Sequence, residues 1–246
     1  MRNHILDEST IGSAKVIVDI LPKGKVIPGT VITPTSITIH NTGNVGAPAK
    51  NNHNYMKNCN KNGDRIASWH FTVDDNYIYQ AIPANNKAYH AGTTRGNNTS
   101  IGIEICMFND KERQRKAYIN AIELVKILMK HYNFTADKIK QHYDWSKKDC
   151  PTWLRSGKFG YTWSWFKNQI TEVLSFSNKD KDDGSFLVKV LVDELNVRTG
   201  PSTDYRIVGQ VHKDDVYTIV KTNGNFGFLK SGKGWISIHS KYVKKL

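Results

Sequence analysis

SIGIEIC, residues 100–106, alternates between apolar side chains and small or polar ones with the period of two that a β-strand requires. One face of this strand carries three isoleucines, and the other carries Gly102, Glu104 and Cys106. The isoleucine face is expected to pack on a hydrophobic core. Glu104 therefore points away from the core, on a face where a carboxylate could do chemistry or simply meet solvent.

Other segments around this strand alternate in the same way or repeat at helical spacing. Strands are expected at SITIH (36–40), ASWHFTVDD (67–75) and YIYQAIP (77–83). Apolar residues at steps of three and four predict a long helix through Tyr118 and Tyr132, and a second helix is expected over 163–174. Strands interleaved with helices predict an α/β domain with a central sheet.

The rhythm of the sequence changes after SNKDKDDGS, residues 177–185, a short charged segment without apolar periodicity. The apolar runs that follow are brief and are separated by turn sequences such as TGPS and SGKG. They predict a small β-barrel suited to binding. The predicted organisation is a catalytic domain over 1–176, a linker over 177–185 and a binding domain over 186–246.

Composition narrows the class of protein. The chain has 246 residues, 39% of them hydrophobic, which predicts a folded protein. Its formal net charge of +13 suggests a polyanionic partner such as nucleic acid, anionic lipid or anionic cell-wall polymers, although solubility alone also explains such a charge. Nucleic acid is not expected, because the chain has no nucleic-acid-binding motif. Three cysteines are too few, and odd in number, for a disulfide scaffold. We expect no membrane insertion and no signal peptide, because no apolar segment has the required length.

Three side chains have the character of metal ligands. His142 and Cys150 lie in the polar loop QHYDWSKKDCPTW (141–153), and His40 ends the apolar strand SITIH. Two imidazoles and a thiolate suit zinc, and three protein ligands leave a fourth position for water, as in catalytic sites. The alternatives are an inert buried thiol and loop histidines with ordinary structural hydrogen bonds.

Taken in order, these segments resemble the zinc-dependent N-acetylmuramoyl-L-alanine amidase type 2 family over about residues 30–170. The matching motifs are ITIHNT, SWHFTVDD, AYHAG, SIGIEIC and HYDWSKKDCP. The C-terminal part, with LNVRTGPSTDYRIVGQV and GWISI, is similar to a bacterial SH3-type domain. The resemblance implies a mixed central sheet flanked by helices, as in peptidoglycan recognition proteins, followed by a small all-β barrel that binds the cell wall.

The resemblance also implies a mechanism. One Zn²⁺ per chain would be held by His40, His142 and Cys150. Glu104 would exchange protons with the attacking water and the leaving amine, and Lys148 would stabilise the oxyanion. The implied reaction is hydrolysis of the amide bond between N-acetylmuramic acid and L-alanine in bacterial peptidoglycan.

Further residues are assigned to binding on weaker grounds. Those expected to contact substrate are Asn41, His70, His90 and Thr152. Those expected to contact the cell wall are Tyr205, Tyr217 and Trp235. For the histidines the alternative is a structural hydrogen bond, and for the aromatic residues it is packing in the barrel core.

Two other functions fit the same sequence. One is a peptidoglycan-binding protein without hydrolytic activity, although such members of the fold family typically lack the cysteine ligand. The other is a zinc peptidase that cuts within the stem peptide. The resemblance together with the lack of an export signal favours a phage endolysin, made in the host cytoplasm and reaching the wall after holin-type release, over a bacterial autolysin. The sequence predicts neither the oligomeric state nor the host.

Overall fold

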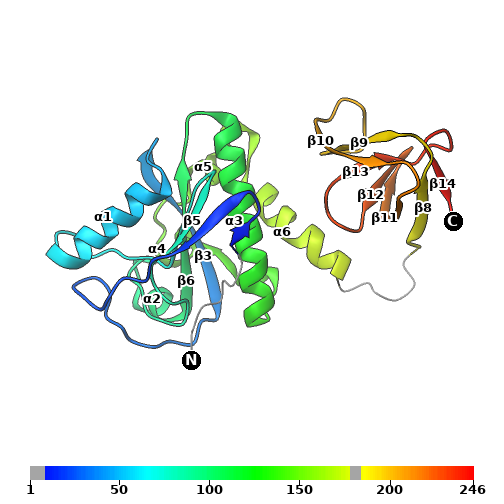
Figure 1. Ribbon diagram of the computed structural model, residues 1–246. Coiled ribbons are helices and arrows are strands. Elements are labelled where there is room, and N and C mark those ends of the chain that lie inside the picture. The colour runs from blue at the N-terminus through cyan, green and yellow to red at the C-terminus, as the bar shows by residue number, and fades with distance from the viewer. Residues whose placement is uncertain (1–8, 178–183) are drawn as a thin grey trace. The chain divides into compact units, whose positions relative to one another are not determined.

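The computed structural model describes residues 9–177 and 184–246 (Figure 1). It divides into two units, with the boundary between Glu172 and Val173, and each unit is built on a seven-stranded sheet. Most of the expected linker, residues 177–185, lies outside the described residues, as does the side chain of Val173 on the second predicted helix. No helix among the described residues is long and apolar enough to cross a membrane.

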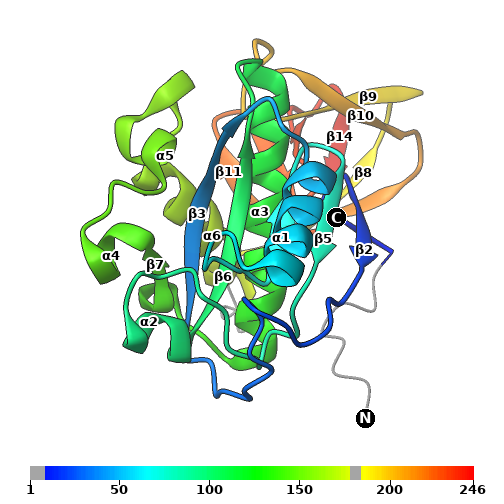
Figure 2. The same ribbon diagram turned by 90° about the vertical axis from the view of Figure 1, so that its left-hand side faces the viewer.

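The first unit is a mixed sheet with helices on both faces. Its elements are β1 (Thr10–Ile11), β2 (Ala14–Val18), β3 (Ser36–Val45), α1 (Ala49–Asn62), β4 (Phe71–Val73), β5 (Tyr77–Gln80), α2 (Thr94–Thr99), β6 (Ser100–Met107), α3 (Lys111–Tyr132), β7 (Ile139–Gln141), α4 (His142–Ser146), α5 (Thr152–Ser156) and α6 (Trp163–Ser177). The strand order is β1-β2-β5-β4-β6-β3-β7, with both parallel and antiparallel pairs. Helices α1 and α3 lie on opposite sides of the sheet (Figure 2). The predicted fold class is confirmed.

The register of the central strands decides which side chains share a face. β3 and β4 both pair in parallel with β6, and His40 lies opposite Glu104, which in turn lies opposite Thr72. Neighbours in register point to the same side of a sheet. His40 and Glu104 therefore project together from one face, while the fully buried Ile103 and Ile105 of β6 project from the other.

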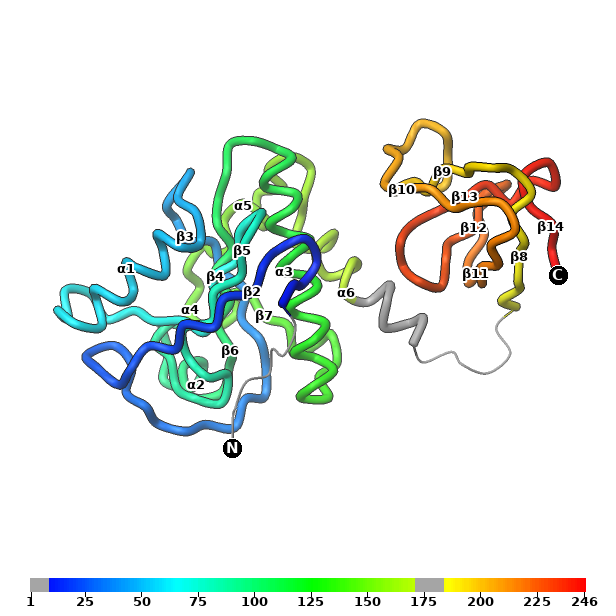
Figure 3. Tube along the Cα trace, in the orientation of Figure 1, coloured from blue at the N-terminus to red at the C-terminus, as the bar shows by residue number. Residues whose placement is uncertain are grey.

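Several elements differ from the sequence-based expectation. Helix α1 was not predicted, because several of the residues that it buries are polar. β4 covers three residues rather than the nine of ASWHFTVDD. Residues 9–35, for which no element was predicted, extend the sheet through the parallel pairing of β2 with β5 and then run to β3 as a long loop (Figure 3).

The second unit is all β. Its strands are β8 (Phe186–Val190), β9 (Glu194–Arg198), β10 (Ile207–His212), β11 (Val216–Asn223), β12 (Phe226–Leu229), β13 (Trp235–Ser237) and β14 (Val243–Lys245), in the order β10-β9-β13-β12-β11-β8-β14. All strand pairs are antiparallel. A cluster of buried aliphatic side chains, including Val188, Ile219 and Ile236, forms a core in its described residues. The expected small all-β domain is confirmed.

Asp74 ties the turn between β4 and β5 to the start of α1. Its buried carboxylate accepts hydrogen bonds from the backbone N–H of Ala49 at 2.7 Å, of Asn76 at 2.7 Å and of Tyr77 at 2.5 Å. The N-cap residue of α1 is Pro48, whose side chain makes no capping hydrogen bond. Asp74 therefore satisfies a helix donor that local sequence leaves without a partner.

Replacing this carboxylate should measurably weaken the first unit. Asp74→Ala leaves three backbone donors without their acceptor and is expected to lower the free energy of unfolding by about 2–4 kcal/mol, measured by urea denaturation. Asp74→Asn keeps one acceptor oxygen and should lose less. Equal stability of wild type and Asp74→Ala would contradict this role.

Candidate functional site

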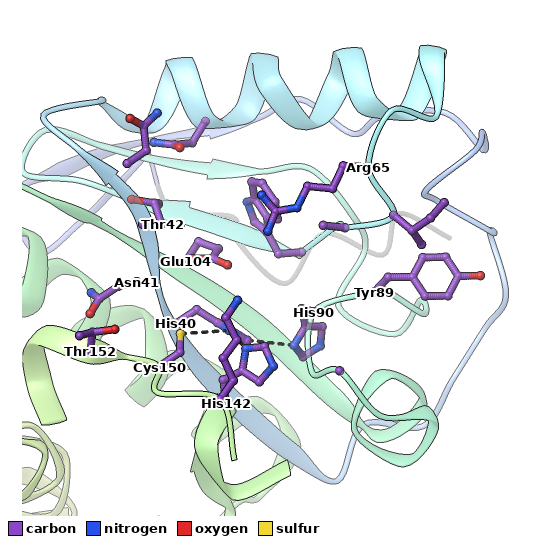
Figure 4. Close-up of a pocket in the computed structure, with 18 of the residues that line it drawn as sticks. His40, Asn41, Thr42, Arg65, Tyr89, His90, Glu104, His142, Cys150 and Thr152 are labelled. Atoms are coloured by element: carbon purple, nitrogen blue, oxygen red, sulfur yellow. Dashed lines mark hydrogen bonds between the residues drawn. The ribbon is translucent and has the colours of Figure 1, made fainter. Parts of the chain in front are cut away.

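A cavity of about 860 Å³ opens on the polar face of the first unit's sheet. Residues from strands β3 and β6, from α4 and from several loops line it (Figure 4). They include the predicted ligands and Glu104, together with Lys148. The cavity is also lined by residues to which the sequence assigned no role, among them Thr42, Arg65 and Tyr89.

The three candidate ligands come together at the floor of this cavity. His40 lies in β3, His142 is the first residue of α4, and Cys150 follows in the loop before α5; all three are buried. Their ligand atoms lie within 4.8 Å of one another. His40 Nδ1 is 3.1 Å from His142 Nδ1 and 3.8 Å from Cys150 Sγ. The structure thus gathers segments that are 110 residues apart in the chain around one point.

The chemistry of these donors fits a divalent cation. Burial lowers the pKa of His142 to about 4, and it lowers the pKa of His40 well below its usual value, so both imidazoles are neutral and can offer a lone pair. Burial raises the pKa of the Cys150 thiol to about 12. Two neutral imidazoles and a sulfur at this spacing form a donor set suited to zinc, which also stabilises the thiolate.

Glu104 extends into the same cavity from β6. Its Oε2 atom is shielded from solvent and has no hydrogen-bond partner among the described residues. Burial raises the pKa of Glu104 to about 8, and the positive charges of Lys148 and Arg65 oppose this rise. A half-buried carboxyl group with a free oxygen, beside a three-donor cluster, can accept and return a proton.

The two histidines predicted to contact substrate lie deeper than expected. His70 is fully buried, accepts a hydrogen bond from Gly102 N–H at 2.8 Å and reaches the Asn86 carbonyl oxygen at 2.8 Å through Nε2. Both of its ring nitrogens are thus occupied, and a substrate contact does not fit this placement. His90 borders the cavity, but its ring nitrogens are hydrogen-bonded to His40 and to Ser100.

Asn41 and Thr152 both border the cavity, as expected for substrate contacts. Asn41 Oδ1 accepts a hydrogen bond from Trp153 N–H at 3.1 Å, which fixes the side chain. The Thr152 hydroxyl donates to the Asp149 carbonyl at 2.7 Å. The Asn41 amide nitrogen has no partner within the described part of the chain, so it could still donate to a ligand.

In the second unit, the three aromatic residues assigned to wall binding differ in exposure. Tyr205 is 48% exposed. Tyr217 is half-buried and its hydroxyl donates to Asp215 at 3.0 Å. Trp235 is only 9% exposed and packs beside Phe228, so a wall contact through Trp235 does not fit and its ring belongs to the core of the sheet.

Comparison with known proteins gives two family matches. Residues 31–153 match the family model described as N-acetylmuramoyl-L-alanine amidase, and residues 193–244 match the bacterial SH3 domain. Among curated relatives, the N-acetylmuramoyl-L-alanine amidase XlyA of Bacillus subtilis is 43% identical over 63% of this chain and 50% of its own length. The N-acetylmuramoyl-L-alanine amidase CwlH of Bacillus subtilis is 41% identical over 58% of this chain and 56% of its own length.

Solved structures agree with the amidase match. The catalytic domain of XlyA aligns with a TM-score of 0.56 and 41% identity, covering 64% of this chain and 99% of that domain. The structure of PlyL aligns with a TM-score of 0.55 and 32% identity, covering 63% of this chain and 96% of PlyL. This chain spans about half the length of the curated relatives XlyA and CwlH.

Proposed function

The chain belongs to the N-acetylmuramoyl-L-alanine amidase family, and on that basis we propose that it hydrolyses the amide bond between N-acetylmuramic acid and L-alanine in bacterial peptidoglycan. The observation that carries this proposal is the cluster of His40, His142 and Cys150 beside the Glu104 carboxyl group in one cavity. A cavity of this volume can admit a segment of sugar and peptide.

We propose that the three clustered side chains hold one zinc ion. Zinc bound there would act as a Lewis acid toward carbonyl and water oxygens. The presence of the cysteine in the cluster counts against the alternative of a binding protein without hydrolytic activity. It does not distinguish an amidase from a peptidase, because the same groups could attack any amide.

Glu104 and Lys148 would carry the charges and protons of the reaction. In this proposal Glu104 removes a proton from the water that attacks the carbonyl carbon and then delivers it to the alanine nitrogen as the C–N bond breaks. Lys148 is exposed at the cavity and would place its ammonium near the oxyanion that forms on the carbonyl oxygen. Asn41 and Thr152, at the rim, would contact the substrate.

The metal proposal predicts stoichiometric zinc binding that depends on the thiol. Wild-type protein should bind one zinc ion per chain, measured by atomic absorption after dialysis. Cys150→Ser replaces a thiolate by a poor ligand and should weaken zinc affinity by at least about 100-fold. Cys59→Ser, at a buried thiol outside the cluster, is the matched control and should bind zinc as the wild type does. Equal zinc affinity of both variants would contradict the proposed site.

The role of Glu104 predicts a separation of metal binding from catalysis. Glu104→Gln keeps the shape of the side chain but cannot accept the proton, so lysis of purified walls should fall by about 100-fold or more while zinc binding persists. Mass spectrometry of the released fragments should show new amino termini at L-alanine. Termini inside the stem peptide would instead identify a peptidase, and near-normal lysis by Glu104→Gln would contradict the mechanism.

The second unit is proposed to bind the cell wall. From Gly184 onward the chain carries ten basic and five acidic side chains, and Tyr205 is exposed at its surface. This positive charge fits anionic wall polymers as a partner in addition to peptidoglycan. We propose that the protein acts as an endolysin on the wall after holin-type release.

An electrostatic contribution to wall binding predicts sensitivity to salt. Raising the ionic strength from about 50 mM to about 500 mM shortens the screening length and should release most of the protein from purified walls, measured by sedimentation. Walls stripped of their anionic polymers should bind less protein at low salt. Binding that ignores both treatments would exclude these polymers as a partner.

A further inference from the structure

A chain of hydrogen bonds runs from the backbone of β6 to the metal-ligand cluster by way of His90. His90 Nε2 lies 3.1 Å from the carbonyl oxygen of Ser100, and His90 Nδ1 lies 3.0 Å from His40 Nε2. The rings of His90 and His40 are nearly perpendicular, at 87°. Both rings are buried, and their neighbours therefore determine where each ring proton sits.

The direction of these hydrogen bonds follows from the one partner that cannot donate. The Ser100 carbonyl oxygen only accepts, so His90 Nε2 must carry the proton. In a neutral imidazole the other nitrogen is then bare, and His90 Nδ1 accepts the proton of His40 Nε2. His40 Nδ1 is left with its lone pair, and this is the atom that faces His142 and Cys150.

The surroundings of His90 hold its ring in this orientation. A side chain at Gly102 would place its Cβ atom 2.7 Å from His90 Cγ, so only glycine lets the ring lie against β6. Asn97 Oδ1 accepts the backbone N–H of His90 at 3.0 Å and that of Ala91 at 2.8 Å. The ring is therefore fixed by its backbone on one side and by the strand on the other.

We propose that His90 is a positioning residue that sets the tautomer of His40, directing its Nδ1 lone pair at the metal, rather than a substrate contact. This inference rests on the proposed zinc site and concerns how that site is held ready. A ligand histidine whose second nitrogen donates to a fixed acceptor is pre-oriented and more basic. Here the acceptor is a second imidazole, whose own proton is held by a main-chain carbonyl.

The tautomer can be observed without any substitution. In metal-free wild-type protein labelled with ¹⁵N-histidine, NMR should show His40 with a protonated Nε2 and a bare Nδ1, and His90 with the same pattern. A protonated Nδ1 on His40 would overturn the proposal.

Variants at position 90 then test whether the tautomer of His40 affects the zinc affinity of the site. His90→Leu removes the acceptor and should weaken zinc affinity by about 10- to 100-fold, measured by competition with a chelator. His90→Asn can return an acceptor oxygen near the place of Nδ1 and should recover part of that loss. His53→Leu removes another buried histidine, on α1 and hydrogen-bonded to Asp19, and should leave zinc affinity unchanged.

The outcomes separate this inference from the proposed function. Zinc binding by His90→Leu as tight as that of the wild type would overturn the tautomer role alone. A loss in His53→Leu equal to that in His90→Leu would overturn it as well, because the effect would then be general destabilisation. Failure of the wild type to bind zinc would overturn the proposed function and this inference together.

Discussion

The parallel register that sets His40 of β3 opposite Glu104 of β6 is the constraint on which the site depends. Side chains alternate along a strand, so a slip of one residue would move either group to the opposite face. The isoleucines of β6 are fully buried on that opposite face, and such a slip would bring them out of the core. The hydrophobic effect on one side of the sheet thereby enforces the geometry of polar groups on the other.

Burying polar side chains on this face of the sheet costs free energy unless they are hydrogen-bonded, and in the cavity some of them are not. Most buried polar atoms there are hydrogen-bonded, as in the path from Ser100 through His90 to His40. Glu104 Oε2, Asn41 Nδ2 and the Thr42 hydroxyl are shielded and lack partners among the described residues. Each such group costs about 1–3 kcal/mol. A ligand that completes these hydrogen bonds would recover this free energy, so the folded chain is prepared for an occupant.

The sequence predicted an element correctly where apolar residues recur at the spacing of a strand or a helix. The alternation of SIGIEIC and the spacing in α3 predicted β6 and the long helix, because in both an apolar set recurs at the period of the element: three isoleucines in β6, and Tyr118, Ile122, Val125 and Met129 in α3. Helix α1 was not predicted because its buried face includes the polar residue Asn60. The Asn60 side-chain oxygen accepts hydrogen bonds from the backbone N–H groups of Val26 and Ile27. Arg65, in a loop with no motif, reaches the cavity only through tertiary packing. The burial of Trp235 could not be predicted either, since the sequence pattern of a strand is the same whether its aromatic residue packs in a core or lines a binding groove.

The candidate ligands come from opposite ends of the first unit, so they are synthesised at different times. His40 leaves the ribosome 110 residues before Cys150, a delay of roughly 6–20 s at typical rates of synthesis. Until His142 follows, 102 residues after His40, the nascent chain holds one of the three donors, and the set is complete only with Cys150. The proposed metal site is therefore complete only after the loop that precedes α5 has been synthesised.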